Sequence, residues 1–186
     1  MVKKVGVVLL VLFAVLAGLV ALQPAAYSVE RAAEIRAPAS VVIGYLAKAR
    51  AWEAWSAWHR IDPNMKLSYE GPESGPGSAY LWDGNAEVGK GRLTITSVTD
   101  RVVETRLEFI SPFEGVARQT FTLDPTPEGT RVTWRMEGEH NFIGKAFSLV
   151  MSADSMIGSQ FDKSLAALAE VAEAEANPPL EPSHEG

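Results

Sequence analysis

The sequence of 186 residues contains no cysteine and only three histidines. Without cysteine the chain can form no disulfide, has no thiol nucleophile, offers no thiolate to zinc and carries no N-terminal cysteine for lipid attachment. The three histidines, His59, His140 and His184, are far apart and do not follow a metal-binding spacing such as HExxH. We therefore expect no metal site and no cofactor.

Positive charge is also scarce. The chain has 17 lysines and arginines against 23 aspartates and glutamates, so its formal net charge is −6. Lys3 and Lys4 precede a long apolar segment, and the chain beyond them has 15 basic and 23 acidic residues, a net charge of −8. Because nucleic-acid binding depends on lysine and arginine contacts to phosphate, this balance predicts no nucleic-acid partner. It also argues against an anionic membrane surface as the partner.

Familiar catalytic motifs are missing as well. The sequence has neither a GxSxG nucleophile elbow nor a phosphate-binding GxxxxGK[ST] loop. Carboxylate pairs such as Glu104 and Glu108 are expected on the water-exposed face of a strand, where no burial raises their pKa as a general acid requires. The sequence thus identifies no catalytic residues, and a binding protein is favoured over an enzyme.

A long apolar run is present near the N-terminus. Residues Val5 to Leu22 are 18 consecutive apolar residues, directly after Lys3 and Lys4. A membrane-spanning helix needs about 17–25 such residues, whereas the apolar core of a secretory signal is usually about 7–15 residues long. We predict that residues 1–26 are an uncleaved anchor, in contact with the membrane through residues 5–22. The alternative is a cleaved signal segment, which would leave the domain secreted or periplasmic.

The basic residues before this run also predict an orientation. Lys3 and Lys4 favour the cytoplasmic side, so we expect a single-pass protein with a cytoplasmic N-terminus and an extracytoplasmic domain.

Alternation of apolar and polar residues predicts seven strands in this domain. The first strand covers Tyr27 to Arg36 and ends at Pro38, because proline has no N–H for a sheet ladder. Six more follow at short intervals: Met65–Glu70, Ala79–Asp83, Arg92–Thr96, Val103–Phe109, Thr120–Asp124 and Arg131–Glu137. Short connections favour an antiparallel sheet with one apolar face and one charged face.

Helical spacing occurs on both sides of the six consecutive strands. A short helix is predicted from Pro38 to about Ala49, and another from Ile143 to Met151. The longest soluble helix has one apolar stripe and stops before Asn177-Pro178-Pro179. The stripe consists of Ile157, Phe161, Leu165, Leu168 and Ala172. Gly158 lies beside it, where the missing side chain permits a close approach. Residues 177–186 are polar and proline-rich, and we predict that they are disordered.

Several segments, taken in order, resemble the SRPBCC superfamily, which includes START lipid-transfer domains, pathogenesis-related allergens and polyketide cyclases. The similarity covers Tyr27 to about Ala176. The segments that carry it are Ile35-Arg36-Ala37-Pro38, Trp52-Glu53-Ala54-Trp55-Ser56-Ala57-Trp58, Tyr69-Glu70-Gly71-Pro72 with Gly75-Pro76-Gly77, Val132-Thr133-Trp134-Arg135-Met136-Glu137-Gly138, Met156-Ile157-Gly158 and Phe161-Asp162-Lys163-Ser164-Leu165.

The resemblance implies an α+β helix-grip fold, in which a long C-terminal helix closes a bent antiparallel sheet. We assign residues 27–176 to this domain. The resemblance also implies a module that binds a hydrophobic small molecule or lipid between sheet and helix. Two alternatives stay open: an enzyme of the polyketide cyclase or dehydratase type, and an interaction domain with a filled core.

The candidate ligand-binding residues are those expected to face the space between sheet and helix. From the strands these are Tyr80, Trp82, Leu93, Leu107, Phe109, Phe121 and Trp134, and from the C-terminal region Met151, Ile157 and Phe161. Ligand pockets are mostly apolar with a few polar groups. Here those groups would be the Tyr80 hydroxyl, Thr105 and the indole N–H groups of Trp82 and Trp134.

The tryptophans Trp52, Trp55 and Trp58 have a spacing of three residues, so a helix would place them on nearly one side. They are expected to pack the short helices onto the sheet. The alternative is that they line a cavity mouth or contact lipid headgroups. His59 follows the last of them and is expected on the surface, with the pocket mouth as its alternative. For His140-Asn141 we expect local backbone hydrogen bonding at a strand-to-helix junction.

Overall fold

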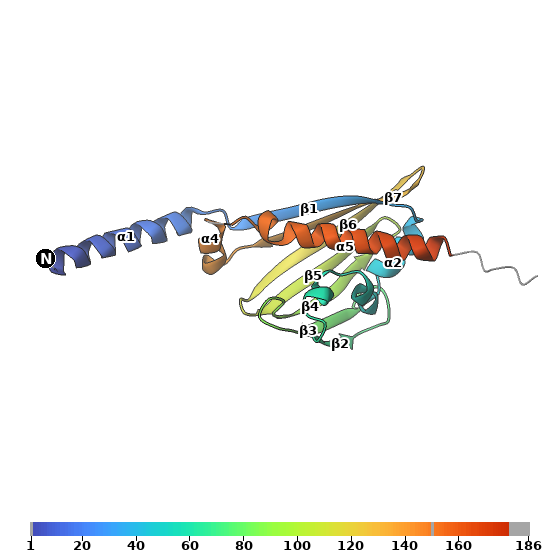
Figure 1. The fold of residues 1–186 in the computed structure, drawn as a ribbon, viewed down its shortest axis with the longest axis horizontal. Coiled ribbons are helices and arrows are strands. Elements are labelled where there is room, and N and C mark those ends of the chain that lie inside the picture. Colours follow the sequence, from blue (N-terminus) through green and yellow to red (C-terminus); the bar gives the residue numbers. More distant parts are fainter. Residues whose placement is uncertain (1, 150, 179–186) are drawn as a thin grey trace, which may run out of the picture.

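The alternating segments form one continuous antiparallel sheet (Figure 1). The computed structural model describes residues 2–149 and 151–178. Its strand order is β1-β7-β6-β5-β4-β3-β2, and every neighbouring pair is antiparallel. The strands are β1 (Ala26–Ile35), β2 (Lys66–Glu70), β3 (Ala79–Asp83), β4 (Lys90–Val98), β5 (Val102–Ser111), β6 (Gly115–Thr126) and β7 (Gly129–Glu139). The predicted sheet of about seven strands is confirmed.

The sheet curves around the elements that connect β1 to β2. These elements are α2 (Ala39–Leu46), the 3₁₀ helix η1 (Ala49–Ala54) and α3 (Trp58–Ile61). Register shifts interrupt the β4–β5 ladder at Lys90/Gly91 and at Ile95/Ser97. Such irregularities bend a strand and increase its twist, which helps the sheet to curl.

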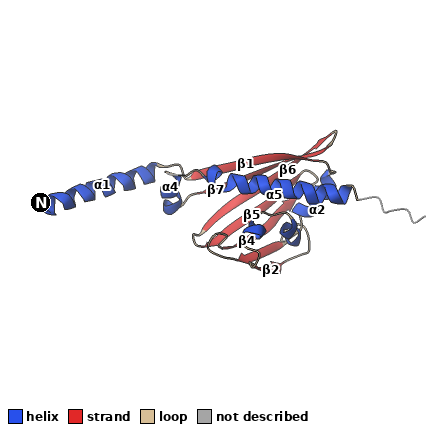
Figure 2. Ribbon diagram, viewed as in Figure 1, coloured by secondary structure: helices blue, strands red, loops and turns tan. Residues whose placement is uncertain are grey.

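The long helix α5 (Ala153–Ala176) lies across the sheet (Figure 2). The Ser152 side chain caps it by accepting a hydrogen bond from the Ser155 N–H at 3.1 Å. Its stripe residues Phe161, Leu165, Leu168 and Ala172 are all at most 2% exposed. The helix contacts β1, α2 and η1, so the predicted closure of the sheet by a C-terminal helix is confirmed.

Gly158 of α5 permits a close approach to β1. The Arg31 guanidinium of β1 occupies the position where a Cβ at residue 158 would lie. Arg31 donates to Asp154 at 2.7 Å and to Asp162 at 3.3 Å, one helical turn on either side of the glycine. Its hydrogen bond with Asp154 is the largest cause of a raised pKa for Arg31 and of a lowered pKa for Asp154.

The apolar N-terminal run is the helix α1 (Val2–Leu22), which is long and apolar enough over Lys4–Leu22 to cross a membrane. Its last turn contacts the short helix α4 (Phe142–Ser148), and Val20 is buried there. The carbonyl of Ala25 accepts a hydrogen bond from the His140 N–H at 2.7 Å. This bond holds the chain that leaves α1 beside the chain that enters α4.

The tryptophan segment differs from a single helix. The helix after β1 ends at Leu46, with Pro38 at its N-cap, before the predicted end at Ala49. The chain then forms η1 and turns at Trp55 before α3 begins. Two hydrogen bonds explain the break: Trp52 Nε1 donates to the Leu46 carbonyl at 3.1 Å, and the Ala57 N–H donates to Ser164 Oγ of α5 at 2.9 Å.

Of the predicted disordered tail, residues 179–186 lie outside the described residues.

Aromatic side chains form the centre of the core. Trp134 of β7 stacks on Phe161 of α5 with ring centroids 3.8 Å apart and an interplanar angle of 6°. Phe121 of β6 stacks on Trp134 at 4.9 Å. Trp52 and Trp55 meet both Phe121 and Trp134 edge-on, at 5.7–6.4 Å. Such stacked and edge-on pairs contribute stability beyond the area they bury.

Phe121→Ala should therefore lower the free energy of unfolding by about 3–5 kcal/mol, because it leaves a cavity in a fully buried cluster. The measurement is urea unfolding of the full chain in detergent. Arg118 is an exposed residue on the outer face of the same strand, and Arg118→Ala should change this energy by less than about 0.5 kcal/mol. Equal effects of the two substitutions would contradict the assigned facing of β6.

Candidate ligand-binding site

A cavity of about 380 Å³ lies within the curved sheet and is covered by α3, α4 and α5. Its wall is mostly apolar and aromatic. At about 30 Å³ of liquid per water molecule, the space corresponds to on the order of ten waters. It falls within the range of about 300–1,000 Å³ found for small-molecule pockets. The core is therefore not filled throughout.

Nine of the ten candidate ligand-binding residues lie in the cavity wall. They are Tyr80, Trp82, Leu93, Leu107, Phe109, Trp134, Met151, Ile157 and Phe161. For those on strands, the alternation of side chains explains their place in the wall, since every second residue of a strand faces the same side of the sheet. Phe121 is absent from the wall because it is fully buried beneath the stacked ring of Trp134. That the other nine bind a ligand stays a prediction.

The tryptophan segment contributes both to the core and to the wall. Trp52 and Trp55 are 2% and 0% exposed, so they pack the short helices onto the sheet as expected. Trp52 and Trp58 also line the cavity. Trp58 packs edge-on against Phe161 at 6.0 Å, so α3 completes the wall opposite the strands.

Two of the predicted polar groups are engaged with the protein itself. Trp82 Nε1 donates to the Val88 carbonyl at 3.1 Å. Thr105 is absent from the cavity wall, and its hydroxyl donates to Gln119 Oε1 at 3.1 Å. Trp134 Nε1, in contrast, is buried without a hydrogen-bond partner. Tyr80 lies in the wall, and burial raises the pKa of its hydroxyl.

His59 lies in the cavity wall, so the prediction of a surface histidine is wrong. Its Nδ1 and Nε2 are both buried and have no hydrogen-bond partner. Burial lowers the pKa of His59, and the nearby Glu53 carboxylate offsets this only in part. The imidazole is therefore neutral at pH 7. Its ring centroid lies 5.8 Å from that of Tyr80. The turn after Trp55 brings His59 inward, and the only sequence signal was its position next to Trp58.

One end of the cavity is formed by residues that the sequence did not identify. Tyr27 of β1 stacks on His140 with ring centroids 4.5 Å apart, and both line the wall. The expected local backbone hydrogen bond at this junction is made by Asn141, whose Oδ1 accepts from the Gly144 N–H at 2.8 Å. The His140 N–H instead donates to the Ala25 carbonyl, which is distant in the sequence. Phe113, in the connection from β5 to β6, lies 6.3 Å from Phe147 of α4. The signal for Phe113 was an aromatic residue in a hairpin turn, where polar residues are usual.

The cavity opens at this end of the domain. Phe113, Ile143, Phe147 and Met151 line it, yet each is 45–54% exposed. Side chains that face both the cavity and the surface mark its mouth. The site is thus a mostly apolar pocket with the buried His59 imidazole in its wall, and its entrance lies between α4 and the β5–β6 connection. Within residues 2–149 and 151–178, no group of three His, Asp or Glu side chains is placed to hold a metal ion.

His59 makes a pH dependence of stability testable. Because its folded-state pKa is lowered, the unfolded chain binds a proton more readily than the folded chain. Stability should therefore fall as the pH drops through about 6.5, the usual pKa of histidine. His59→Gln should remove this part of the pH dependence, measured as urea unfolding of the full chain in detergent between pH 7.5 and 5.5. An identical pH slope in the two proteins would contradict the burial of a neutral His59.

Comparisons with known proteins agree with this architecture. A family model described as polyketide cyclase / dehydrase and lipid transport matches residues 26–173. No curated protein matches the sequence significantly.

Solved structures share the fold. The Zhui aromatase/cyclase from Streptomyces sp. R1128 has a TM-score of 0.57 and 14% identity, over 82% of this chain and 97% of that chain. The major latex-like protein 151 from Panax ginseng has a TM-score of 0.53 and 14% identity, over 83% and 99%. A protein from Rhizobium leguminosarum has a TM-score of 0.58 and 11% identity, over 80% and 95%.

The family match runs from the first residue of β1 to the last turns of α5. It confirms the resemblance to the SRPBCC superfamily, and the structural similarities confirm the helix-grip fold. The chain belongs to the polyketide cyclase/dehydrase and lipid transport family.

Proposed function

We propose that this protein binds a hydrophobic small molecule or a lipid in the cavity between the sheet and α5, while α1 anchors it in a membrane. The observation that carries the proposal is the cavity itself. Its wall is mostly apolar and its mouth is formed by exposed apolar side chains. Burial of an apolar ligand there would contribute about 25 cal/mol per Å² of surface removed from water. Family membership supports a hydrophobic ligand.

The anchor part of the proposal rests on α1. Lys3 and Lys4 lie at the N-terminal end of the span, and by the positive-inside rule they favour a cytoplasmic N-terminus and an extracytoplasmic domain. An anchored binding domain meets membrane-derived ligands at a high effective concentration.

A second candidate is catalysis of the cyclase or dehydrase type. One observation favours it: the neutral imidazole of His59 lies in the cavity wall, close to the Tyr80 ring. A neutral imidazole is a suitable general base. Against it, neither ring nitrogen of His59 is accessible in the structure, so a proton could be exchanged with a substrate only after the ring moves. Binding without chemistry is therefore the favoured function.

The protein purified from membranes should carry a co-purifying apolar compound, detected by mass spectrometry of an organic extract. Ile157→Trp should lower its occupancy and weaken binding of N-phenyl-1-naphthylamine, followed by the dye's own emission, because the larger side chain enters the cavity. Ala166→Trp is the matched control, since Ala166 is exposed on the same helix. A protein that is empty in repeated preparations and binds no dye would contradict the proposal.

The same extract separates the two candidate functions. If the protein only binds, wild type and His59→Gln should yield the same compound. Compounds that differ by the mass of one water would instead support dehydrase chemistry.

The intact mass of the membrane-extracted protein should correspond to the full chain of 20.1 kDa, because α1 is expected to stay attached. A mature protein that begins near residue 26 would show that the segment is a cleaved signal and would remove the anchor from the proposal.

A further inference from the structure

Exposed apolar side chains of the domain are concentrated at one end. Within the described residues after α1, the large apolar side chains that are more than a third exposed belong to two short segments. The first is the β5–β6 hairpin, where Ile110 at the end of β5, Phe113 in the connection and Val116 at the start of β6 are 46–49% exposed. We call this segment, together with the second one described next, the apolar rim.

The second segment of the apolar rim is α4 with the residues that follow it. Phe142, Ile143, Phe147, Leu149 and Met151 are 39–59% exposed here. A scattered exposed apolar residue needs no explanation, but a contiguous patch marks an interaction site.

The two segments meet in space although they are distant in the sequence. The rings of Phe113 and Phe147 lie 6.3 Å apart, and Asn141 Nδ2 donates to the Glu114 carbonyl at 3.4 Å. Four of the eight rim side chains also line the cavity. The apolar rim therefore surrounds the mouth of the pocket.

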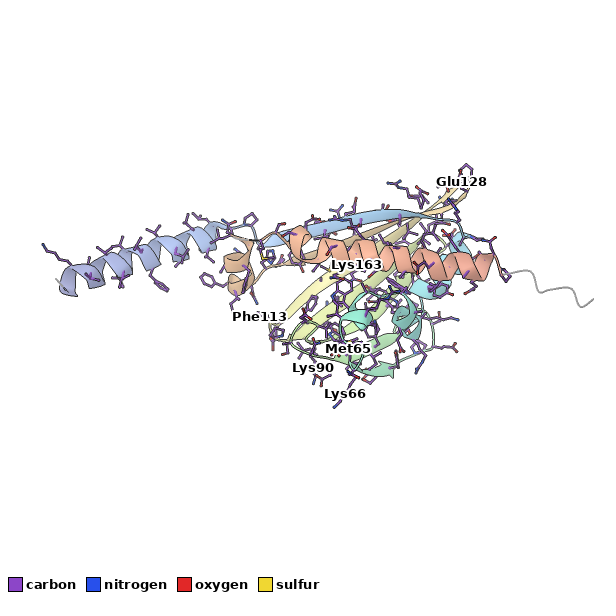
Figure 3. All side chains as sticks on the ribbon, viewed as in Figure 1. Met65, Lys66, Lys90, Phe113, Glu128 and Lys163 are labelled. Atoms are coloured by element: carbon purple, nitrogen blue, oxygen red, sulfur yellow. The ribbon has the colours of Figure 1, made fainter. Side chains whose placement is uncertain are left out.

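The apolar rim adjoins the end of α1. The connection from α1 to β1 is residues 23–25, which span at most about 11 Å when extended. The hydrogen bond between Ala25 and His140, and the contact of α1 with α4, hold the rim beside the last turn of α1. Figure 1 shows α4 between α1 and the sheet, and Figure 3 shows Phe113 toward this end of the domain and Glu128 at the opposite end.

We propose that the apolar rim docks into the interfacial layer of the lipid bilayer that α1 crosses, so that the cavity opens onto the lipid. The docked surface is continuous with α1, the segment most suited to a membrane, and this continuity favours lipid over a soluble partner. With a net charge of −8 outside the anchor, the attraction is apolar, so neutral zwitterionic lipid suffices. Docking of the rim rests on the proposed anchoring by α1, and direct passage of the ligand between bilayer and cavity rests in addition on the proposed ligand binding.

The absence of cysteine allows a direct test with single-cysteine variants of the full chain in phosphatidylcholine nanodiscs. A nitrobenzoxadiazole probe is attached at Phe142→Cys or Val116→Cys, two rim positions outside the cavity wall, so burial in the pocket cannot mimic burial in lipid. Glu128→Cys and Lys66→Cys are exposed controls away from the rim. Quenching by nitroxide-labelled phosphatidylcholine is compared with quenching by aqueous iodide.

The rim probes should be quenched by the nitroxide lipid and protected from iodide, and both control probes should show the reverse. This pattern should not change with salt. Iodide quenching of the rim probes equal to that of the controls would overturn the proposal. Protection from both quenchers would also overturn it, because a second copy of the chain or another protein would then cover the rim.

A transfer measurement separates this proposal from the proposed function. Phe142→Ser combined with Val116→Ser should slow the transfer of N-phenyl-1-naphthylamine from vesicles to the protein several-fold, with equilibrium affinity unchanged. Ile157→Trp should weaken the affinity itself. Unchanged transfer in the rim variant would overturn direct exchange, while failure of every form to bind dye would contradict only the proposed function.

Discussion

Trp134 of β7 and Phe161 of α5 stack face to face, 3.8 Å apart, and this contact sets the separation of helix and sheet at the centre of the domain. Phe121 supports the Trp134 ring from the next strand, and Trp52 and Trp55 close around both from the chain that follows α2. Because large rigid rings meet here in defined orientations, α5 has little freedom to move closer to the strands. The hollow beside this cluster exists because the cluster holds the layers apart.

The two halves of α5 therefore have different surroundings. Toward its C-terminus, Leu165, Leu168 and Ala172 are fully packed. Toward its N-terminus, Ile157 and the preceding Met151 face the cavity. A filled core and a ligand cavity, which look like alternatives in the sequence, are thus both present, on opposite sides of the Trp134–Phe161 stack. The sealed half supplies stability, and the other half encloses the cavity.

Local patterns in the sequence predict the strands, the long helix and the inward faces well, because each depends on residues two to four positions apart. Phe121 shows where such patterns end. The alternation along its strand correctly predicts that its side chain points inward. Only its pairing with Trp134 across β6 and β7, however, determines that Phe121 lies behind the cavity wall and is not part of it. His59 depends on a turn stabilised by Ser164, more than a hundred residues later. The meeting of Phe113 with Phe147 likewise requires the folded sheet, since neither segment signals the other.

The ten-residue ladder between β1 and β7 has a mechanical consequence. Because α1 leads into β1 through only three residues, any pull between α1 and the domain acts along the axis of β1. All the rungs from Ala26–Glu139 to Ile35–Thr130 then resist together in shear, assisted by Arg31 across to α5. An attachment at the far end of a hairpin would instead open its rungs one at a time. The domain is thus joined to α1 in the direction in which a β-sheet best resists force.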